Sequence, residues 1–175
     1  MNEEARLFAE RIGRAIDRVV AATDTLTPAQ VSWQPTLTGW NSLSGIVAHV
    51  LANAEENICG VIGGEITERD RESEFAPSGD SAAQLVARWQ RLRPRLDSRI
   101  GSLTAEDLGA ARVHPRRGQI TVREVLIVVV GHVGLHEGHA ELTRDYVLAQ
   151  GPLGADVAVL QRQPFVDVDL APKQS

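Results

Sequence analysis

The chain has 175 residues, of which 43% are hydrophobic and 23% are charged, values that are ordinary for one globular domain. Its net charge of −5 and the absence of a strongly basic block argue against nucleic-acid binding. Because Cys59 is the one cysteine, a disulfide framework and a cysteine-based zinc site within one chain are excluded. The charged N-terminus and the short apolar run VLIVVVGHVGL predict neither a signal peptide nor a membrane span, so we expect a cytoplasmic protein with no membrane partner.

Apolar residues recur at helical spacing in four long segments. Pro94 lies inside the third segment and is expected to kink that helix or to end its first half. The sequence TVRE predicts a capping box at the start of the fourth helix. The predicted helices cover residues 3–22, Asn41 or Ser42 to about Ile58, Asp80 or Ser81 onward, and Thr121 to about Leu148.

Two long polar connections join these helices, one after the second helix and one before the fourth. The charge run from Glu68 to Glu74 is expected to be a solvated surface, and His114 is expected to lie at the surface of the second connection. The segment PFVDVDL alternates apolar and acidic residues, which is typical of an extended tail. With no sheet evident, the sequence predicts an all-α four-helix bundle over residues 1–150, with long crossover connections, and an extended tail over 151–175.

Three of the five histidines lie in one stretch of the predicted fourth helix, GHVGLHEGHAEL. His132, His136 and His139 occupy positions i, i+4 and i+7, which fall within about 60° of one another on a helix. Val125 and Val129 continue the same stripe, so the three imidazoles are expected to point into the bundle. Buried imidazoles need hydrogen-bond partners or a bound ion.

An i, i+4 histidine pair can reach a single metal ion, and a third ligand must then come from another helix. His49 lies at the margin of the apolar stripe of the second helix and is a suitable candidate. Three neutral nitrogen ligands with one open position are typical of a catalytic site rather than a structural one. The spacing also allows His136 and His139 to share the ion, and it allows all of these histidines to be hydrogen-bonded core residues.

Two polar residues lie on the same side of the second helix as His49. Asn53 and Glu56 stand at i+4 and i+7 from this histidine. They either line the cavity and orient His49 or form a solvated helix edge.

The stretches LTPAQVSWQPTLTGWNSLSGIVAHV and TVREVLIVVVGHVGLHEGHAELTRDYV carry a family resemblance. The first contains a Trp-x-Pro loop, a serine-capped helix and a histidine, and the second contains a His-x-x-x-His pair. From about residue 7 to 148 the chain resembles the DinB/YfiT-like superfamily of metal-binding four-helix bundles, which includes the mycothiol-dependent maleylpyruvate isomerases. The resemblance implies His49, His132 and His136 as metal ligands and His139 as a pocket residue beside them. It also implies zinc or nickel, and in some members a low-molecular-weight thiol such as mycothiol.

These patterns predict a metal-dependent enzyme that acts on a small-molecule substrate, either a thiol-dependent S-transferase or a hydrolase with a metal bound by three histidines. One alternative is a non-catalytic metal- or ligand-binding stress-response module, for which we expect a closed site with His139 or Glu56 as a fourth ligand. Another is a structural homodimer in which the histidines are core hydrogen-bonding residues. For the leading hypothesis we also expect a homodimer.

Overall fold

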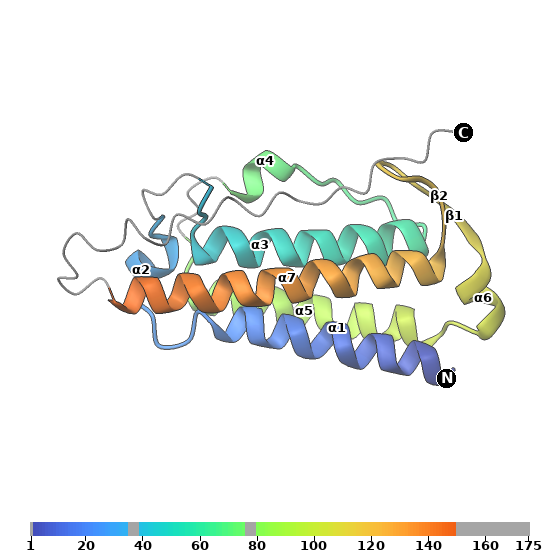
Figure 1. The fold of residues 1–175 in the computed structure, drawn as a ribbon, viewed down its shortest axis with the longest axis horizontal. Coiled ribbons are helices and arrows are strands. Elements are labelled where there is room, and N and C mark those ends of the chain that lie inside the picture. Colours follow the sequence, from blue (N-terminus) through green and yellow to red (C-terminus); the bar gives the residue numbers. More distant parts are fainter. Residues whose placement is uncertain (1, 35–38, 76–79, 150–175) are drawn as a thin grey trace.

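The computed structural model describes residues 2–34, 39–75 and 80–149. Its four long helices are α1 (Glu3–Ala21), α3 (Leu43–Ala54), α5 (Ala82–Gly101) and α7 (Val122–Ala149). Helices α1 and α3 each pack against both α5 and α7. Helices α1 and α7 run in one direction along the bundle, and α3 and α5 run in the other (Figure 1). The predicted all-α four-helix bundle is confirmed.

The helices begin where the sequence supplies side-chain caps. Asn2 starts α1 because its Oδ1 accepts the backbone N–H of Glu4 at 2.8 Å, and Ser42 caps α3 in the same way. At the start of α7, the backbone N–H of Thr121 donates to Glu124 Oε2 at 2.8 Å, and the N–H of Glu124 donates to Thr121 Oγ1 at 3.2 Å. This reciprocal pair is the predicted capping box.

The core fills the space between the four helices. Helix α3 is buried on almost every side, because α5 and α7 pack against it from within the bundle and two short helices also contact it. Its apolar side chains meet regularly spaced ones from the other three helices. Representative core residues are Ile12, Ile16, Leu43, Val47, Leu51, Leu85, Leu96, Leu126 and Val129. The short helices are α2 (Pro28–Ser32), which has a capping box at Thr27, and α4 (Arg71–Glu74).

Helix α3 continues into a π-helix, η1 (Glu55–Ile62). The side-chain amide of Asn57 donates to the Asn53 carbonyl at 2.8 Å within this wide segment. Because α3 and α5 are parallel, the connection between them returns along the bundle and carries α4 over α3 (Figure 1). This is one of the predicted long crossover connections.

The connection between α5 and α7 differs from the prediction, since it contains a small sheet. After α6 (Ala105–Gly109), the strands β1 (Ala111–His114) and β2 (Gly118–Thr121) pair antiparallel. The expectation of no sheet is therefore wrong for this segment. Its four-residue strands are too short and too exposed to show the alternation of a half-buried strand. Gly118 adopts a φ of 70° at the end of the turn, a conformation that glycine tolerates best.

Helix α5 does not end at Pro94, which was one of the two expected outcomes, but continues through it to Gly101. Pro94 and Gln90, whose carbonyl loses its helical partner, are both exposed, so water can satisfy that carbonyl. Leu92 and Leu96 remain buried on the opposite face and hold the helix against the core. The predicted tail over 151–175 lies outside the described residues.

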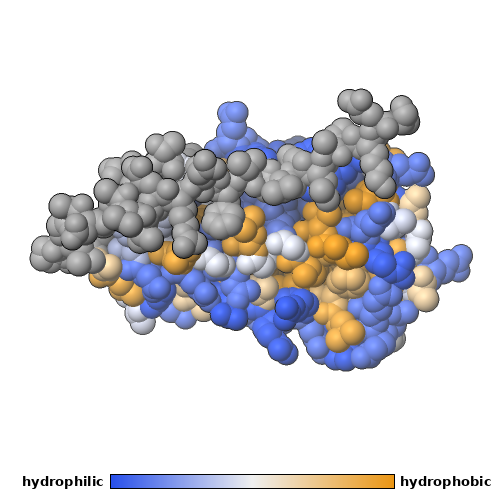
Figure 2. Space-filling model, in the orientation of Figure 1, coloured by the Kyte–Doolittle hydropathy of each residue, from blue (hydrophilic) through white to orange (hydrophobic). Residues whose placement is uncertain are grey.

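On the face seen in Figure 2, the described surface is mainly hydrophilic, with apolar residues gathered in places. Large exposed apolar side chains include Leu7 on α1 and Ile127 and Leu142 on α7. Within the described ranges, no helix combines the length and the apolar character that a membrane span requires. The expected homodimer stays a prediction.

Candidate metal centre

Three histidines meet between α3 and α7. His49 extends from α3, and His132 and His136 extend from successive turns of α7. Their rings lie with centroids 4.5 to 4.9 Å apart, and one potential ligand atom from each lies within 4.8 Å of the others. The structure thus brings together the three residues that the sequence singled out as ligands, and it positions them for one metal ion.

The environment of His136 favours the neutral imidazole. His49 and His136 are 2% and 9% exposed. Desolvation, followed by the charges of the neighbouring histidines, lowers the pKa of His136 to about 2. A neutral imidazole is the form that binds a metal ion, so the site does not have to lose a proton from His136 before an ion enters.

A carboxylate contacts Nδ1 of His49. Glu74, the last residue of α4, places its Oε2 2.7 Å from Nδ1 of His49. A carboxylate can only accept here, because the pKa of Glu74 lies below its usual value: burial alone would raise it, but hydrogen bonds from His49 and Arg69 outweigh that effect. Nδ1 of His49 therefore carries the proton, and Nε2 is the nitrogen that remains for a metal ion. Such carboxylate–histidine pairs commonly orient metal ligands.

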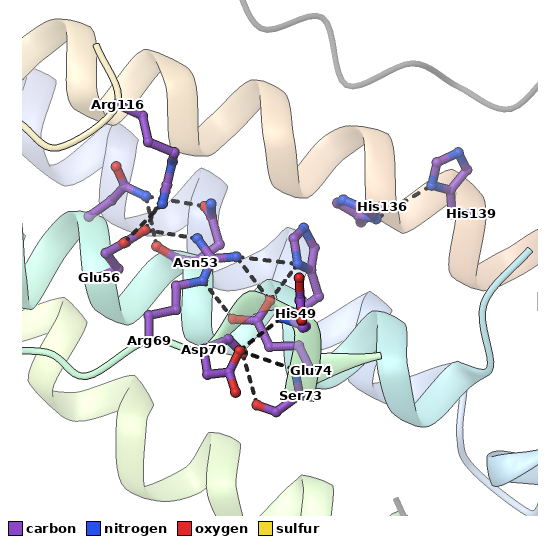
Figure 3. A network of polar contacts seen from close by, with 12 residues as sticks. His49, Asn53, Glu56, Arg69, Asp70, Ser73, Glu74, Arg116, His136 and His139 are labelled. Atoms are coloured by element: carbon purple, nitrogen blue, oxygen red, sulfur yellow. Dashed lines mark hydrogen bonds and ion pairs between the residues drawn. The ribbon is translucent and has the colours of Figure 1, made fainter. Parts of the chain in front are cut away.

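Glu74 belongs to a network of charged side chains, most of them buried, that the sequence did not predict. Arg69 donates through Nε to Glu74 at 2.6 Å and through Nη1 to Glu56 at 2.8 Å. Arg116, from the turn between β1 and β2, donates to the same Glu56 through Nη1 at 3.1 Å. Figure 3 shows Arg69 lying between the two glutamates, with Arg116 converging on Glu56. This network ties the crossover connection and the hairpin to the helix that carries His49.

His139 lies beside the three histidines rather than among them. Its Nδ1 is 3.4 Å from Nδ1 of His136, one helical turn away on α7 (Figure 3). This contact engages Nδ1 of His136, so that Nε2 remains for a metal ion. His139 is thus placed to orient His136 in the way that Glu74 orients His49.

The two polar residues predicted beside His49 are both buried, so the solvated-edge interpretation is wrong. Asn53 lines the cavity next to His49 and accepts from the side chain of Asn57. Glu56 turns instead toward Arg69 and Arg116.

His114 corrects a second expectation, because it is 3% exposed rather than lying at the surface. Its Nδ1 accepts the backbone N–H of Arg116 at 3.0 Å, so its Nε2 carries the proton and donates to Asn57 Oδ1 at 3.1 Å. The hairpin folds over η1 and buries the ring. No local pattern in the sequence marks this packing.

The charge run 68–74 is likewise only partly solvated. Arg69 and Glu74 have side chains that are each 6% exposed, whereas Glu68, Asp70 and Glu72 are exposed. The run contains both positively and negatively charged residues. This mixture is the one feature of its sequence that indicates buried ion pairs.

Comparison with known proteins agrees with this fold. The family model of the DinB superfamily matches residues 11–140. This chain belongs to the DinB superfamily. Two solved structures resemble this DinB-superfamily member: a conserved protein from Enterococcus faecalis and a DinB-like protein from Bacillus cereus. The first is 15% identical with a TM-score of 0.68, covering 85% of this chain and 99% of its own. The second is 16% identical with a TM-score of 0.60, covering 75% and 85%. No curated protein matches the sequence.

In this DinB-superfamily member, a cavity of about 350 Å³ lies against the histidines. His49 and His132 form part of its wall, Asn53 and Asn57 extend the wall along α3 and η1, and Leu135 contributes an apolar side from α7. A molecule in this cavity would therefore lie next to an ion held by the triad.

Proposed function

We propose that this protein is a metal-dependent enzyme in which His49, His132 and His136 hold one divalent ion, zinc or nickel. The observation that carries the proposal is the convergence of three imidazoles from two antiparallel helices, two of which line a cavity large enough for a small molecule. Imidazole nitrogens suit both ions. Three protein ligands leave a coordination position for substrate, as catalytic sites require.

The residues around the triad have separate roles in this proposal. A divalent ion bound there supplies a Lewis acid for an oxygen or sulfur atom of the substrate. Glu74 fixes the proton of His49 on Nδ1, and His139 contacts Nδ1 of His136. Asn53 offers a polar contact to the bound molecule, and Leu135 helps to exclude water. The reaction we favour is transfer of a small thiol, such as mycothiol, to an electrophile, with hydrolysis as the second candidate.

Several contacts count against the non-catalytic alternative with a closed site. A fourth ligand from Glu56 would have to break its ion pairs with Arg69 and Arg116. A ligand from His139 would have to give up its contact with His136. The surroundings of the triad therefore support an open site.

Metal analysis of the purified protein tests the proposal directly. We expect about one transition-metal ion per chain in the wild type and in His139→Ala, and loss of the ion in His136→Ala. Because an ion that binds only the folded state stabilises it, chelation should lower the melting temperature of the first two proteins but not of the third. Wild-type protein without stoichiometric metal, or His136→Ala with it, would contradict the proposal.

An activity assay separates the two reactions. The metal-loaded protein is given a thiol with an aryl halide, and separately an activated ester. Acceleration of thiol consumption that is lost in His136→Ala supports S-transfer, whereas ester cleavage that needs no thiol supports hydrolysis. If neither rate changes while metal is bound, the non-catalytic alternative is favoured.

A further inference from the structure

Asn53 is a buried polar residue whose hydrogen-bond donors have no partner in the protein. It lines the cavity one helical turn after His49 on α3, and it is 8% exposed. Its Oδ1 accepts from Nδ2 of Asn57 at 3.4 Å. Within the described part of the chain, Nδ2 of Asn53 donates to no acceptor. Because an unpaired buried amide costs free energy, a molecule that pairs with this amide in the cavity gains affinity.

A series of hydrogen bonds fixes the direction of the Asn53 amide. The backbone N–H of Arg116 donates to Nδ1 of His114 at 3.0 Å, and Nε2 of His114 donates to Oδ1 of Asn57 at 3.1 Å. Nδ2 of Asn57 is therefore turned toward Asn53, where it donates to the backbone carbonyl at 2.8 Å and to Oδ1. A rotated Asn53 amide would oppose one donor to another. Nδ2 of Asn53 is thus the atom that remains for the cavity.

The local fold places this donor beside the histidines. Helix α3 ends at Ala54 and continues as the π-helix η1, and wide helical turns of this kind are frequent at functional sites. Side chains four residues apart on a helix are neighbours, and both His49 and Asn53 line the cavity. A group that pairs with Asn53 would therefore lie next to His49.

The chemistry of the wall narrows the group that can pair with Asn53. The oxygen of Asn53 is turned toward Asn57, so the residue suits a group that accepts hydrogen bonds and donates none. A carbonyl oxygen is such a group. A hydroxyl would bring a proton that also needs an acceptor, and among the described residues that line the cavity there is no carboxylate to accept it.

We propose that Nδ2 of Asn53 donates a hydrogen bond to a carbonyl oxygen of the substrate, and that this contact selects carbonyl compounds over alcohols of the same size. The cavity of about 350 Å³ fits a small molecule, whose hydrocarbon part packs against Ile127, Val128 and Leu135 of α7. The hydrogen bond does not depend on a metal ion. The closeness of the carbonyl group to a bound ion does rest on the proposed function.

Titrations followed by NMR test this contact. Cyclohexanone and cyclohexanol, a ketone and an alcohol of one size, are added to the nitrogen-15-labelled full-length protein, both metal-free and zinc-loaded. We expect cyclohexanone to shift the side-chain N–H signals of Asn53, which are identified by their absence from the spectrum of Asn53→Leu. This variant should bind cyclohexanone about tenfold more weakly, because the carbonyl oxygen is then buried without a donor.

A second variant tests the selectivity. Asn53→Asp keeps the size of the side chain and replaces its donors with an acceptor. At about pH 8, where this carboxyl is ionised, the ratio of the affinity for cyclohexanone to that for cyclohexanol should fall by about tenfold or more. A ratio that stays at the wild-type value would overturn the selection of carbonyl compounds.

Gln119→Leu is the matched control, because it removes a carboxamide from an exposed position of β2 that does not line the cavity. We expect it to bind both probes like the wild type. The melting temperature of Asn53→Leu should not fall below that of the wild type, since Asn57 keeps the backbone carbonyl of residue 53 as an acceptor. This measurement verifies that the variant folds.

The outcomes separate this inference from the proposed function. Ketone binding that depends on Asn53 in a protein that holds no metal supports the carbonyl contact and refutes the metal-dependent enzyme. Normal metal content with unmoved Asn53 signals, or with unchanged affinity in Asn53→Leu, overturns the inference alone. Failure of cyclohexanone to bind either form overturns it too, as does equal weakening by Gln119→Leu.

Discussion

The substitution Glu74→Gln removes one negative charge from behind His49 and keeps the size of the side chain. In the wild type, Glu74 Oε2 accepts from His49 Nδ1 at 2.7 Å, and both side chains are almost completely shielded from water. A glutamine oxygen can still accept this proton, so Nε2 still faces the other histidines. The imidazole loses the basicity that a carboxylate confers. We expect the affinity for zinc or nickel to fall by about 10- to 100-fold, or roughly 1.4 to 2.7 kcal/mol.

The same substitution disturbs Arg69, which keeps Glu56 as its charged partner. Loss of stability could therefore imitate loss of affinity, and the two must be measured apart. Metal affinity is obtained by competition with a chromogenic chelator under conditions in which circular dichroism shows the variant to be folded. Urea unfolding of the metal-free proteins gives the change in stability.

Glu72→Gln is the matched control, since it removes the same charge from an exposed position of α4. We expect the control to bind metal like the wild type. If Glu74→Gln binds zinc and nickel within twofold of the wild type, Glu74 does not orient His49. If both variants lose affinity equally, the effect comes from net charge and not from the contact between Glu74 and Nδ1.

Two further predictions concern the stability of the metal-free protein. The pKa of His136 is lowered to about 2 in the folded state, whereas in the unfolded chain it has its ordinary value of about 6.5. Below pH 6.5 the unfolded chain therefore binds a proton that the folded protein does not bind, so the free energy of unfolding must fall as the pH drops through that value. Between pH 6.5 and 5, urea unfolding should show a loss of about 1.6 kcal/mol that His136→Leu lacks; parallel pH profiles would refute this. Replacing His114 with leucine leaves Asn57 Oδ1 without its buried donor and should lower the free energy of unfolding by about 1 to 3 kcal/mol. The control Val113→Ala, at an 81% exposed position, should change it by less than about 0.5 kcal/mol. Equal effects of these two substitutions would show that the contact between His114 and Asn57 contributes little.

The bundle and the meeting of the three histidines could be predicted because both follow from local periodicity. The spacing of His132 and His136 places both on one side of a helix, and Val125 and Val129 show that this side is inward. His49 shares an apolar stripe with its neighbours in the same way. In a bundle, the inward-facing residues of neighbouring helices share one interior, so the position of each residue around its helix is enough to bring them together.

The surroundings of the site could not be predicted from the same signals. Glu74, Arg69 and Arg116 lie in connections, where no period relates sequence to direction. A run of mixed charges is usually solvated, and it becomes internal here only because the crossover connection packs over α3. His114 is buried for a comparable reason, since the hairpin that carries it folds onto η1. Such packing depends on tertiary contacts between segments distant in sequence.

The helices and the connections contribute to function in different ways. The rigid packing of α3 against α7 sets the positions of the three histidines, whereas the crossover connection and the hairpin set the charge of the cavity beside them. A bundle can keep its metal ligands while its connections change, because loops tolerate substitution and insertion better than a core does. Residues 69–74 and 114–117 are therefore the segments in which the choice of substrate is expected to reside.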